Sequence, residues 1–342
     1  MAITKIPAAG FTGNNFRNIL INGDMSLAQR GTSFSSISSG NSNYPVDRSR
    51  VNLNTAGTWT LSQDTTVPTG QGFAKSIKVD CTTANGSLSA GSYMILQQLI
   101  EGQNLQYLKK GTSSAESLTV SFWVRSNKTG TYISELYDED NTRHIAKSYT
   151  ISSADTWEKK TLTFAGDTSG TLNNDNGASL TLNFWLAAGS TYSSGTLNTS
   201  WNSVTNANRA VGQVNLADST ANEWYITGVQ LEAGTTASDF EFLPYDVNLA
   251  RCQRYYYSFT STGLSDNFYF KSPYVRSAPN TSASVGYFFK TSMRANPSMS
   301  GVISSGSINR FTANTEVAVA QIGSSSTATA YSLSSYEADA EL

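Results

Sequence analysis

Short runs of alternating apolar and polar residues, separated by clusters of Gly, Asn, Asp and Ser, recur along most of the chain. Examples are "LTVSFWVRS", "SLTLNFWLA" and "EWYITGVQLE". A two-residue alternation is typical of a β-strand with one buried face, whereas the 3.6-residue period of a helix is almost missing. We therefore predict an all-β fold, with a jelly-roll β-sandwich followed by a second, smaller β-sandwich domain.

The chain divides into three parts by composition. Residues 1–17 have no periodicity and contain Pro7 and two glycines, which predicts an extended N-terminal arm. Residues 18–245 carry most of the strand pattern and form the predicted jelly roll. Residues 246–342 form the predicted small β domain, with Pro244 marking the seam. The segment "LQQLIEGQNLQYLKK" is the one place where we expect a short helix or helical turn.

Charge and hydropathy exclude two classes of partner. The formal net charge is −2 and charged residues make up 14% of the chain, with no basic run longer than two residues. The chain therefore lacks the positive surface that nucleic acid requires. No apolar run is long enough to insert into a membrane or to act as a signal peptide. Cys81 and Cys252 lie too far apart in sequence to resemble a metal motif, and we predict two buried thiols in a protein assembled in a reducing cytosol.

Catalytic motifs are missing from the sequence, so we predict no enzyme activity. The single histidine, His144, is placed at the surface by strand parity, and no nucleophile elbow or phosphate-binding loop occurs. The acidic cluster "ELYDED" contains Glu135, Asp138, Glu139 and Asp140, and is predicted to be a solvated hairpin turn. A structural Ca²⁺ ion or a glycosidase carboxylate pair are the alternatives for this cluster. The "NNDNG" loop at residues 173–177 is a second Ca²⁺ candidate, and no other cofactor is expected.

Strand parity selects a candidate carbohydrate-binding surface. In two strands the aliphatic residues share one face, which places four other side chains on the outer face: Trp123, Arg125, Asn183 and Trp185. Exposed indole rings stack on sugars, and amide or guanidinium groups bind sugar hydroxyls. The alternative is that a loop or a neighbouring subunit covers the tryptophans. Tyr192 and Trp201, in the long connections that follow, are further candidates.

Several fragments taken in order resemble a known family. They are "NILINGDMSLAQRGTSF", "YPVDRSR", "LTVSFWVRSNKTGTY", "GVQLEAGTTASDFEFLPY", "RCQRYYY", "MRANP" and the terminal "DAEL". Together they resemble the tail-fibre and related virion structural proteins of bacteriophages, notably marine and cyanobacterial phages. The resemblance implies that residues 18–245 are a carbohydrate-binding type of jelly roll, opened by a strand and tight turn at Ile19 to Asp24. Related chains commonly carry a bulky aromatic after an Asp-Arg pair, whereas this chain has Ser49 after Asp47-Arg48.

The resemblance also implies a biological setting. It predicts a non-catalytic virion appendage, assembled in the bacterial cytoplasm, that recognises a host-surface polysaccharide. Such appendages are usually homotrimers, because several weak contacts combine into tight attachment. The N-terminal arm would then bind another virion protein. Two alternatives remain at this point: a purely structural decoration protein of the capsid or tail, and a polysaccharide depolymerase.

Overall fold

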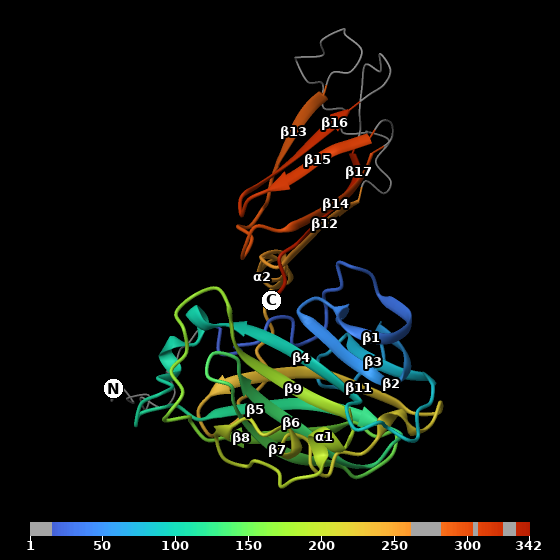
Figure 1. Cartoon of the computed structure of the whole chain (residues 1–342), viewed down its shortest axis with the longest axis vertical. Helices are drawn as coiled ribbons and strands as arrows, with labels where there is room; N and C mark the ends of the chain where they lie inside the picture. The colour runs from blue at the N-terminus through green and yellow to red at the C-terminus, as the bar shows by residue number, and fades with distance from the viewer. Residues whose placement is uncertain (1–15, 261–281, 304–306, 324–332) are drawn as a thin grey trace, which may run out of the picture.

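The computed structural model describes residues 16–260, 282–303, 307–323 and 333–342 (Figure 1). Within these ranges every strand pairing is antiparallel, and helix is limited to short segments. The predicted all-β fold is therefore confirmed. In the described part of the chain no helix is long and apolar enough to cross a membrane.

The N-terminal unit is a two-layer β-sandwich. Its strands are β1 (Ser33–Val46), β2 (Ser49–Asp64), β3 (Ser76–Thr83), β4 (Tyr93–Glu101), β5 (Leu118–Ser126), β6 (Gly130–Asp138), β7 (Arg143–Ile151), β8 (Glu158–Phe164), β9 (Ala178–Ala188), β10 (Asn202–Ser203) and β11 (Glu223–Ala233). They follow the order β10-β7-β6-β9-β4-β2-β3-β11-β5-β8, with β1 paired to β2. The first layer contains β7, β6, β9 and β4, and the second contains β3, β11, β5 and β8. This pairing gives the predicted jelly-roll sandwich.

Strand β2 belongs to both layers. Its first part pairs with β4, from Arg50 to Asn54, and its second part pairs with β3, from Thr58 onward. Between the two parts, Thr55 and Gly57 have φ angles of 49° and 83°, in the left-handed region. A Cβ atom on Gly57 would lie 2.7 Å from the carbonyl oxygen of Thr83. Glycine therefore permits the strand to bend from one layer into the other.

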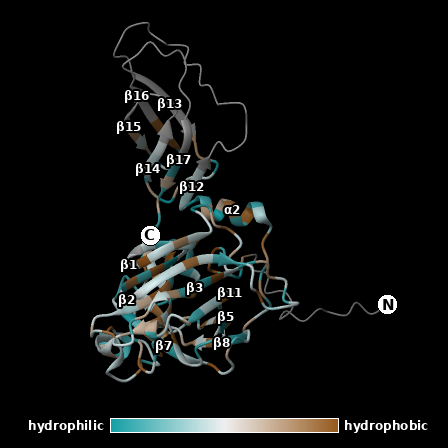
Figure 2. Cartoon of the chain, turned by 90° about the vertical axis from the view of Figure 1, so that its right-hand side faces the viewer, coloured by the Kyte–Doolittle hydropathy of each residue, from teal (hydrophilic) through white to brown (hydrophobic). Residues whose placement is uncertain are grey.

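The core lies between the two layers. Val120, Phe122 and Val124 of β5 are fully buried, as strand parity predicts. The ring centroid of Phe122 lies 4.9 Å from that of Phe184 on β9, which joins the two layers. Hydrophobic and hydrophilic residues alternate along the sandwich strands in Figure 2. Both cysteines are free and buried, as predicted.

Two local predictions need correction. The segment Ile19 to Asp24 is not a strand: it runs beside β11 with only a few backbone hydrogen bonds, such as Ile19 N–H to the Leu231 carbonyl at 2.9 Å. Two buried asparagines, Asn18 and Asn22, hold it by hydrogen bonds to backbone groups. The predicted helical segment is half strand, because β4 continues to Glu101. Only its second half turns, as two 3₁₀ helices, η2 (Gly102–Asn104) and η3 (Gln106–Leu108).

The second unit is smaller and lies beyond helix α2 (Tyr245–Gln253), which begins directly after Pro244. One three-stranded sheet contains β12 (Tyr256–Thr260), β17 (Leu333–Asp339) and β14 (Ser298–Ile303). The other contains β13 (Ser282–Phe288), β16 (Val317–Gly323) and β15 (Ser307–Ala313). Figure 1 shows α2 and the C-terminus between this unit and the sandwich. Residues 1–15 of the predicted arm lie outside the described residues.

Candidate functional site

The four predicted site residues do not form one surface. Trp123 and Arg125 lie on β5 of the second layer, whereas Asn183 and Trp185 lie on β9 of the first layer. Each pair points away from the core, so the two pairs are on opposite sides of the sandwich. The parity prediction was correct for each strand, but parity carries no information about which layer a strand joins.

The exposed-indole prediction is also wrong for Trp185. Its side chain is 0% exposed, because the connection after β9 folds over it. Tyr192, in helix α1 (Ser190–Ser193), lies 5.4 Å from its ring, and the Arg209 guanidinium lies 5.1 Å from its ring. Trp123 is only half-buried, and Arg125 is paired with Asp155 at 2.9 Å and with a second carboxylate at 3.2 Å. The loop-covered alternative therefore describes Trp185.

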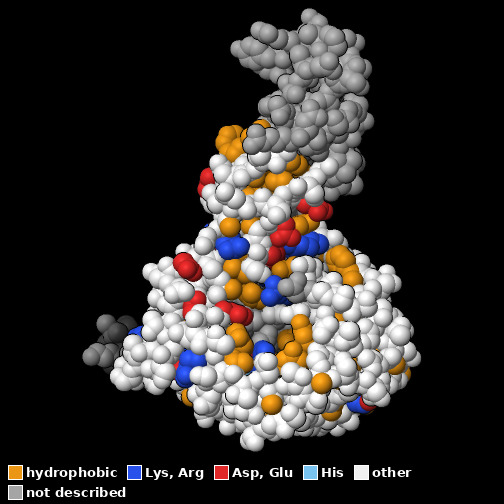
Figure 3. Space-filling view, viewed as in Figure 1, with side chains coloured by type: hydrophobic (Ala, Val, Ile, Leu, Met, Phe, Trp, Pro, Cys, Tyr) orange, Lys and Arg blue, Asp and Glu red, His pale blue; other side chains and the backbone are white. Residues whose placement is uncertain are grey.

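A pocket opens on the outer face of the first layer, beside the covered Trp185. Its volume is about 260 Å³. Figure 3 shows hydrophobic and charged side chains gathered around a hollow on this side of the sandwich. The pocket is lined by Arg50, Asn52, Tyr93, Ile95, Gln97, Tyr137, Glu139, Asn183, Trp185, Tyr192 and Arg209. We call it the outer-face pocket, and two predicted site residues, Asn183 and Trp185, belong to it, as does the loop candidate Tyr192.

Strand register determines which side chains form the floor of the outer-face pocket. Arg50 on β2 lies opposite Gln97 on β4, Gln97 lies opposite Asn183 on β9, and Asn183 lies opposite Glu135 on β6. Residues directly opposite one another in neighbouring strands point to the same face. Four strands therefore contribute one row of polar side chains. Sequence reasoning found only Asn183, because each strand was considered separately.

Aromatic rings and one rim carboxylate form the walls. Tyr93 and Tyr192 meet edge to face at 5.5 Å, and Tyr137 lies under the Arg209 guanidinium at 4.8 Å. Glu139 is exposed at the rim and accepts a hydrogen bond from the Thr181 hydroxyl at 2.6 Å. Partial desolvation by the surrounding protein raises the pKa of Glu139, although the Thr181 hydrogen bond opposes this. The pocket therefore combines half-buried rings with polar groups.

Glu135, fully buried beneath the pocket, organises its floor. Its carboxylate accepts hydrogen bonds from Arg209 at 2.8 and 2.9 Å, from Asn183 at 3.0 Å and from the Trp185 indole at 3.1 Å. His144 Nδ1 lies 2.9 Å from the same carboxylate, and its Nε2 lies 2.7 Å from Asn198 Nδ2. Glu135 thus connects the sheet with the loop that covers Trp185.

Both the histidine and the acidic cluster differ from the sequence predictions. His144 is 0% exposed, not at the surface. Glu135 and Asp138 are also 0% exposed, so they are not part of a solvated turn. Asp138 and Asp167 both pair with the buried Lys110 ammonium, at 2.8 and 3.1 Å.

Among the described residues, no group of three or more His, Cys, Asp or Glu side chains is arranged to hold a metal ion. Trp201, the other loop candidate, lies over Lys110 at 4.2 Å.

Three polar atoms around the outer-face pocket have no hydrogen-bond partner in the part of the chain that the structure describes. They are Gln97 Oε1, Asn183 Oδ1 and Arg50 Nε. Gln97 and Asn183 are 8% and 3% exposed, so water reaches their carbonyls poorly. An unpaired buried carbonyl costs free energy, and each such group in a folded protein calls for an explanation. A ligand that supplies both donors and acceptors in this pocket provides one.

The electrostatics of Glu135 predict how the site responds to acid. Burial alone would raise its pKa, but the Arg209 charge and the hydrogen bond from His144 outweigh burial and lower the pKa from 4.5 to about 2. A group with a lowered pKa stabilises the folded state above its unfolded pKa, and that contribution is lost as the pH falls through the folded value. We expect the free energy of unfolding of the wild type to decrease between about pH 4.5 and pH 2.

Urea unfolding at pH 7, 4 and 3 tests this expectation, with Glu135→Gln as the comparison. Other carboxylates titrate in the same range, so the relevant quantity is the difference between wild type and variant. The destabilisation caused by the variant should shrink as the pH falls. A difference that stays constant from pH 7 to pH 3 would show that Glu135 is not held ionised by its neighbours.

Comparisons with known proteins give structural neighbours only. No family model matches the chain, and no curated protein sequence matches it. One neighbour is the enzymatically active domain of tailspike protein 4 from bacteriophage CBA120, with 14% identity and a TM-score of 0.33, covering 64% of this chain and 22% of that chain. This chain thus matches about a fifth of that tailspike.

Two further neighbours are sugar-bound modules. TmCBM61 in complex with β-1,4-galactotriose shares 12% identity and a TM-score of 0.32, covering 64% of this chain and 99% of that chain. A family 11 carbohydrate-binding module from Clostridium thermocellum, in complex with a β-1,3-1,4-mixed-linked tetrasaccharide, shares 11% identity and a TM-score of 0.30, covering 60% of this chain and 99% of that chain. At such low scores, function has to be inferred from the pocket's own residues.

Proposed function

We propose that this protein is a non-catalytic binding protein that takes a saccharide unit of a host-surface polysaccharide in the outer-face pocket. The observation that carries the proposal is the pair of buried, unpartnered carbonyls of Gln97 and Asn183 beside the unpartnered Arg50 Nε. A sugar hydroxyl donates one hydrogen bond and accepts others, so neighbouring hydroxyls on one ring match such a mixed set of groups. Half-buried tyrosine rings beside these groups suit the apolar face of a sugar ring.

The charges of the pocket favour binding over hydrolysis. Glycoside hydrolysis uses two carboxyl groups, one of which must be able to donate a proton near neutral pH. Glu135 already accepts hydrogen bonds from Arg209, Asn183 and Trp185, and its pKa is lowered to about 2. It is therefore a structural anion. Glu139 is left as a single carboxylate at the rim, which supports recognition without bond cleavage.

The resemblance to phage virion proteins supplies the proposed setting. We propose a tail-fibre or knob protein of the virion, assembled in the bacterial cytoplasm, with the N-terminal arm bound to another virion protein. A pocket of about 260 Å³ holds roughly one sugar ring, so a single site is expected to bind weakly. A homotrimer would present three such sites, and the effective concentration of linked sites would raise the overall avidity.

Substitution of Gln97 is the direct test. Gln97→Ala removes a side chain that has no hydrogen-bond partner among the described residues, so the fold should tolerate the change. We expect affinity for the recognised glycan to fall about tenfold, since a buried hydrogen bond is worth about 1 kcal/mol and its loss leaves ligand groups unpaired. A glycan array identifies the ligand, and titration calorimetry measures the affinity of the full chain.

Gln71→Ala is the matched control, because Gln71 is exposed and lies outside the pocket. It should bind like the wild type. Equal affinity of Gln97→Ala and Gln71→Ala would remove the outer-face pocket as the site. Binding to no glycan at all, with the protein located on the virion by labelled imaging, would favour the structural decoration role.

A further inference from the structure

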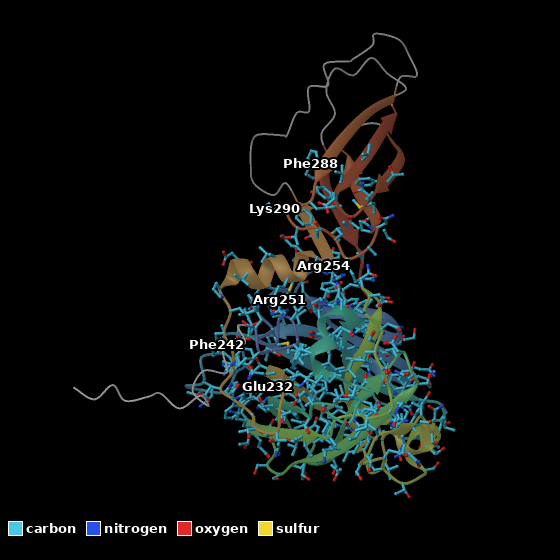
Figure 4. All side chains as sticks on the ribbon, turned by 90° about the vertical axis from the view of Figure 1, so that its left-hand side faces the viewer. Glu232, Phe242, Arg251, Arg254, Phe288 and Lys290 are labelled. Atoms are coloured by element: carbon cyan, nitrogen blue, oxygen red, sulfur yellow. The ribbon has the colours of Figure 1, made fainter. Side chains whose placement is uncertain are left out.

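A second, larger cavity lies between the sandwich and helix α2. Its volume is about 540 Å³, and three of the side chains that line it are arginines: Arg48, Arg251 and Arg254. Figure 4 shows Arg251 and Arg254 where α2 meets the sandwich. None of the described residues that line this cavity is acidic. We call it the hinge cavity, and none of its lining residues is shared with the outer-face pocket.

Two of the three arginines are already paired. Arg254 binds Glu101 through two hydrogen bonds of 3.0 and 2.8 Å. Arg48 is 3% exposed, forms an ion pair with Glu341 and donates to the Leu99 carbonyl at 2.6 Å. Its Nε is buried and has no hydrogen-bond partner among the described residues. One donor of this guanidinium therefore remains unused.

Arg251 is the third arginine of the cavity, and it makes no hydrogen bond or ion pair with any described residue. Its guanidinium lies 5.6 Å from the ring centroid of Phe16 and is attracted electrostatically by the Glu241 carboxylate. The nearby Glu241 carboxylate instead accepts hydrogen bonds from the backbone N–H groups of Phe16 and Asn18. Burial lowers the pKa of Arg251. A partly buried charge without an ion-pair partner among the described residues is unfavourable, and a bound anion would offset that cost.

Uncharged groups around the cavity indicate what kind of molecule carries the anionic group. Tyr107 is 45% exposed and presents a ring at the cavity. The Asn104 amide is exposed beside it and has no partner among the residues that the structure describes. A ring surface and a free amide next to the Arg251 guanidinium suit a carboxylate carried on a polyhydroxylated ring.

We infer that the hinge cavity is a second binding site, for the carboxylate of an acidic saccharide, with the Arg251 guanidinium as its donor and Arg48 adding positive charge. The inference goes beyond the proposed function, because the outer-face pocket is suited to neutral hydroxyls and lies elsewhere on the sandwich. Guanidinium groups recognise carboxylates by charge-assisted hydrogen bonds, which are stronger than neutral ones. Tyr107 and Asn104 would contact the ring that carries the carboxylate.

The test uses trigalacturonate as the probe and the full chain, by titration calorimetry at low and at high salt. We expect the wild type to bind trigalacturonate, with weaker binding at high salt because exposed charge interactions are screened. Arg251→Gln should reduce the affinity at least about tenfold, since hydrogen bonds to charged groups are stronger than average. Methyl-esterified trigalacturonate is the uncharged form of the same trimer. Its affinity for the wild type should be as low as the affinity of trigalacturonate for Arg251→Gln.

Lys159→Gln serves as the charge-matched control, because Lys159 is exposed on β8 and lines neither cavity. It should bind trigalacturonate like the wild type. Three outcomes would overturn the inference: no binding of trigalacturonate, equal loss in Lys159→Gln, or loss in Gln97→Ala but not in Arg251→Gln. Inorganic phosphate that competes with an affinity equal to that of trigalacturonate would overturn the assignment to a saccharide. The outer-face pocket can fail its own test without changing any of these results.

Discussion

Glu135→Ala is expected to lose about 3–5 kcal/mol of unfolding free energy, because removing one partner of a buried ion pair leaves the other charge uncompensated. Arg209 and the indole of Trp185 both lose their acceptor, and so does Asn183. The loop that Arg209 anchors over Trp185 should open as a consequence. We therefore expect glycan binding to be lost even at temperatures where the variant is still folded.

Urea unfolding and tryptophan fluorescence measure the two effects. Glu116→Ala is the control, because the exposed Glu116–Lys109 pair should contribute less than about 1 kcal/mol. Glu135→Gln keeps the side-chain shape and should lose less stability than Glu135→Ala. If Glu135→Ala is no less stable than Glu116→Ala, the network around Glu135 does not hold the pocket.

Glu341→Ala is expected to have a comparable effect at the junction of the two units. The last residues of the chain return to the sandwich, where Glu341 pairs with Arg48 and with Arg30. Arg50 binds the Leu342 carbonyl at 2.9 Å, and Arg294 donates to the Glu341 carbonyl at 3.1 Å. Truncating Glu341 leaves the nearly buried Arg48 without its carboxylate, so about 3–5 kcal/mol should be lost.

Hydrogen exchange distinguishes this effect from a general loss of stability. In Glu341→Ala, amides of α2 and of strands β12 and β17 should exchange faster than in the wild type. Amides of the central strand β9 should change only through global unfolding. Glu337→Ala is the matched control, since Glu337 is exposed on β17. Unchanged exchange in α2 together with wild-type stability would mean that the C-terminal residues do not join the two units.

Strand parity was informative because it depends only on local geometry. Alternation placed Phe122 and Phe184 in the core, and both are buried there. The same rule placed Trp185 away from that core, and its ring is indeed excluded from the main cluster. It failed for the exposure of Trp185 and His144, because Arg209 and Asn198 come from a connection that parity does not describe.

The candidate sites could not be found from the sequence, because they also depend on contacts between distant segments. Gln97 is one of two adjacent glutamines in β4, and only the strand register, which sets it between Arg50 and Asn183, distinguishes it from its neighbour. Nothing in "RCQRYYY" distinguishes Arg251 from other charged residues. That no carboxylate of the described residues pairs with it is a property of the packed structure, since only the fold decides which carboxylates come within reach.

The sequence by itself determined that the chain folds as antiparallel strands with a buried aliphatic face, because side-chain alternation and turn residues act over a few neighbouring positions. Only the tertiary structure decided which strands became neighbours, which outer face the long connection covers, and which polar groups stay unpaired. These features depend on contacts between residues far apart in the chain, such as Glu135 with Arg209 and Arg48 with Glu341.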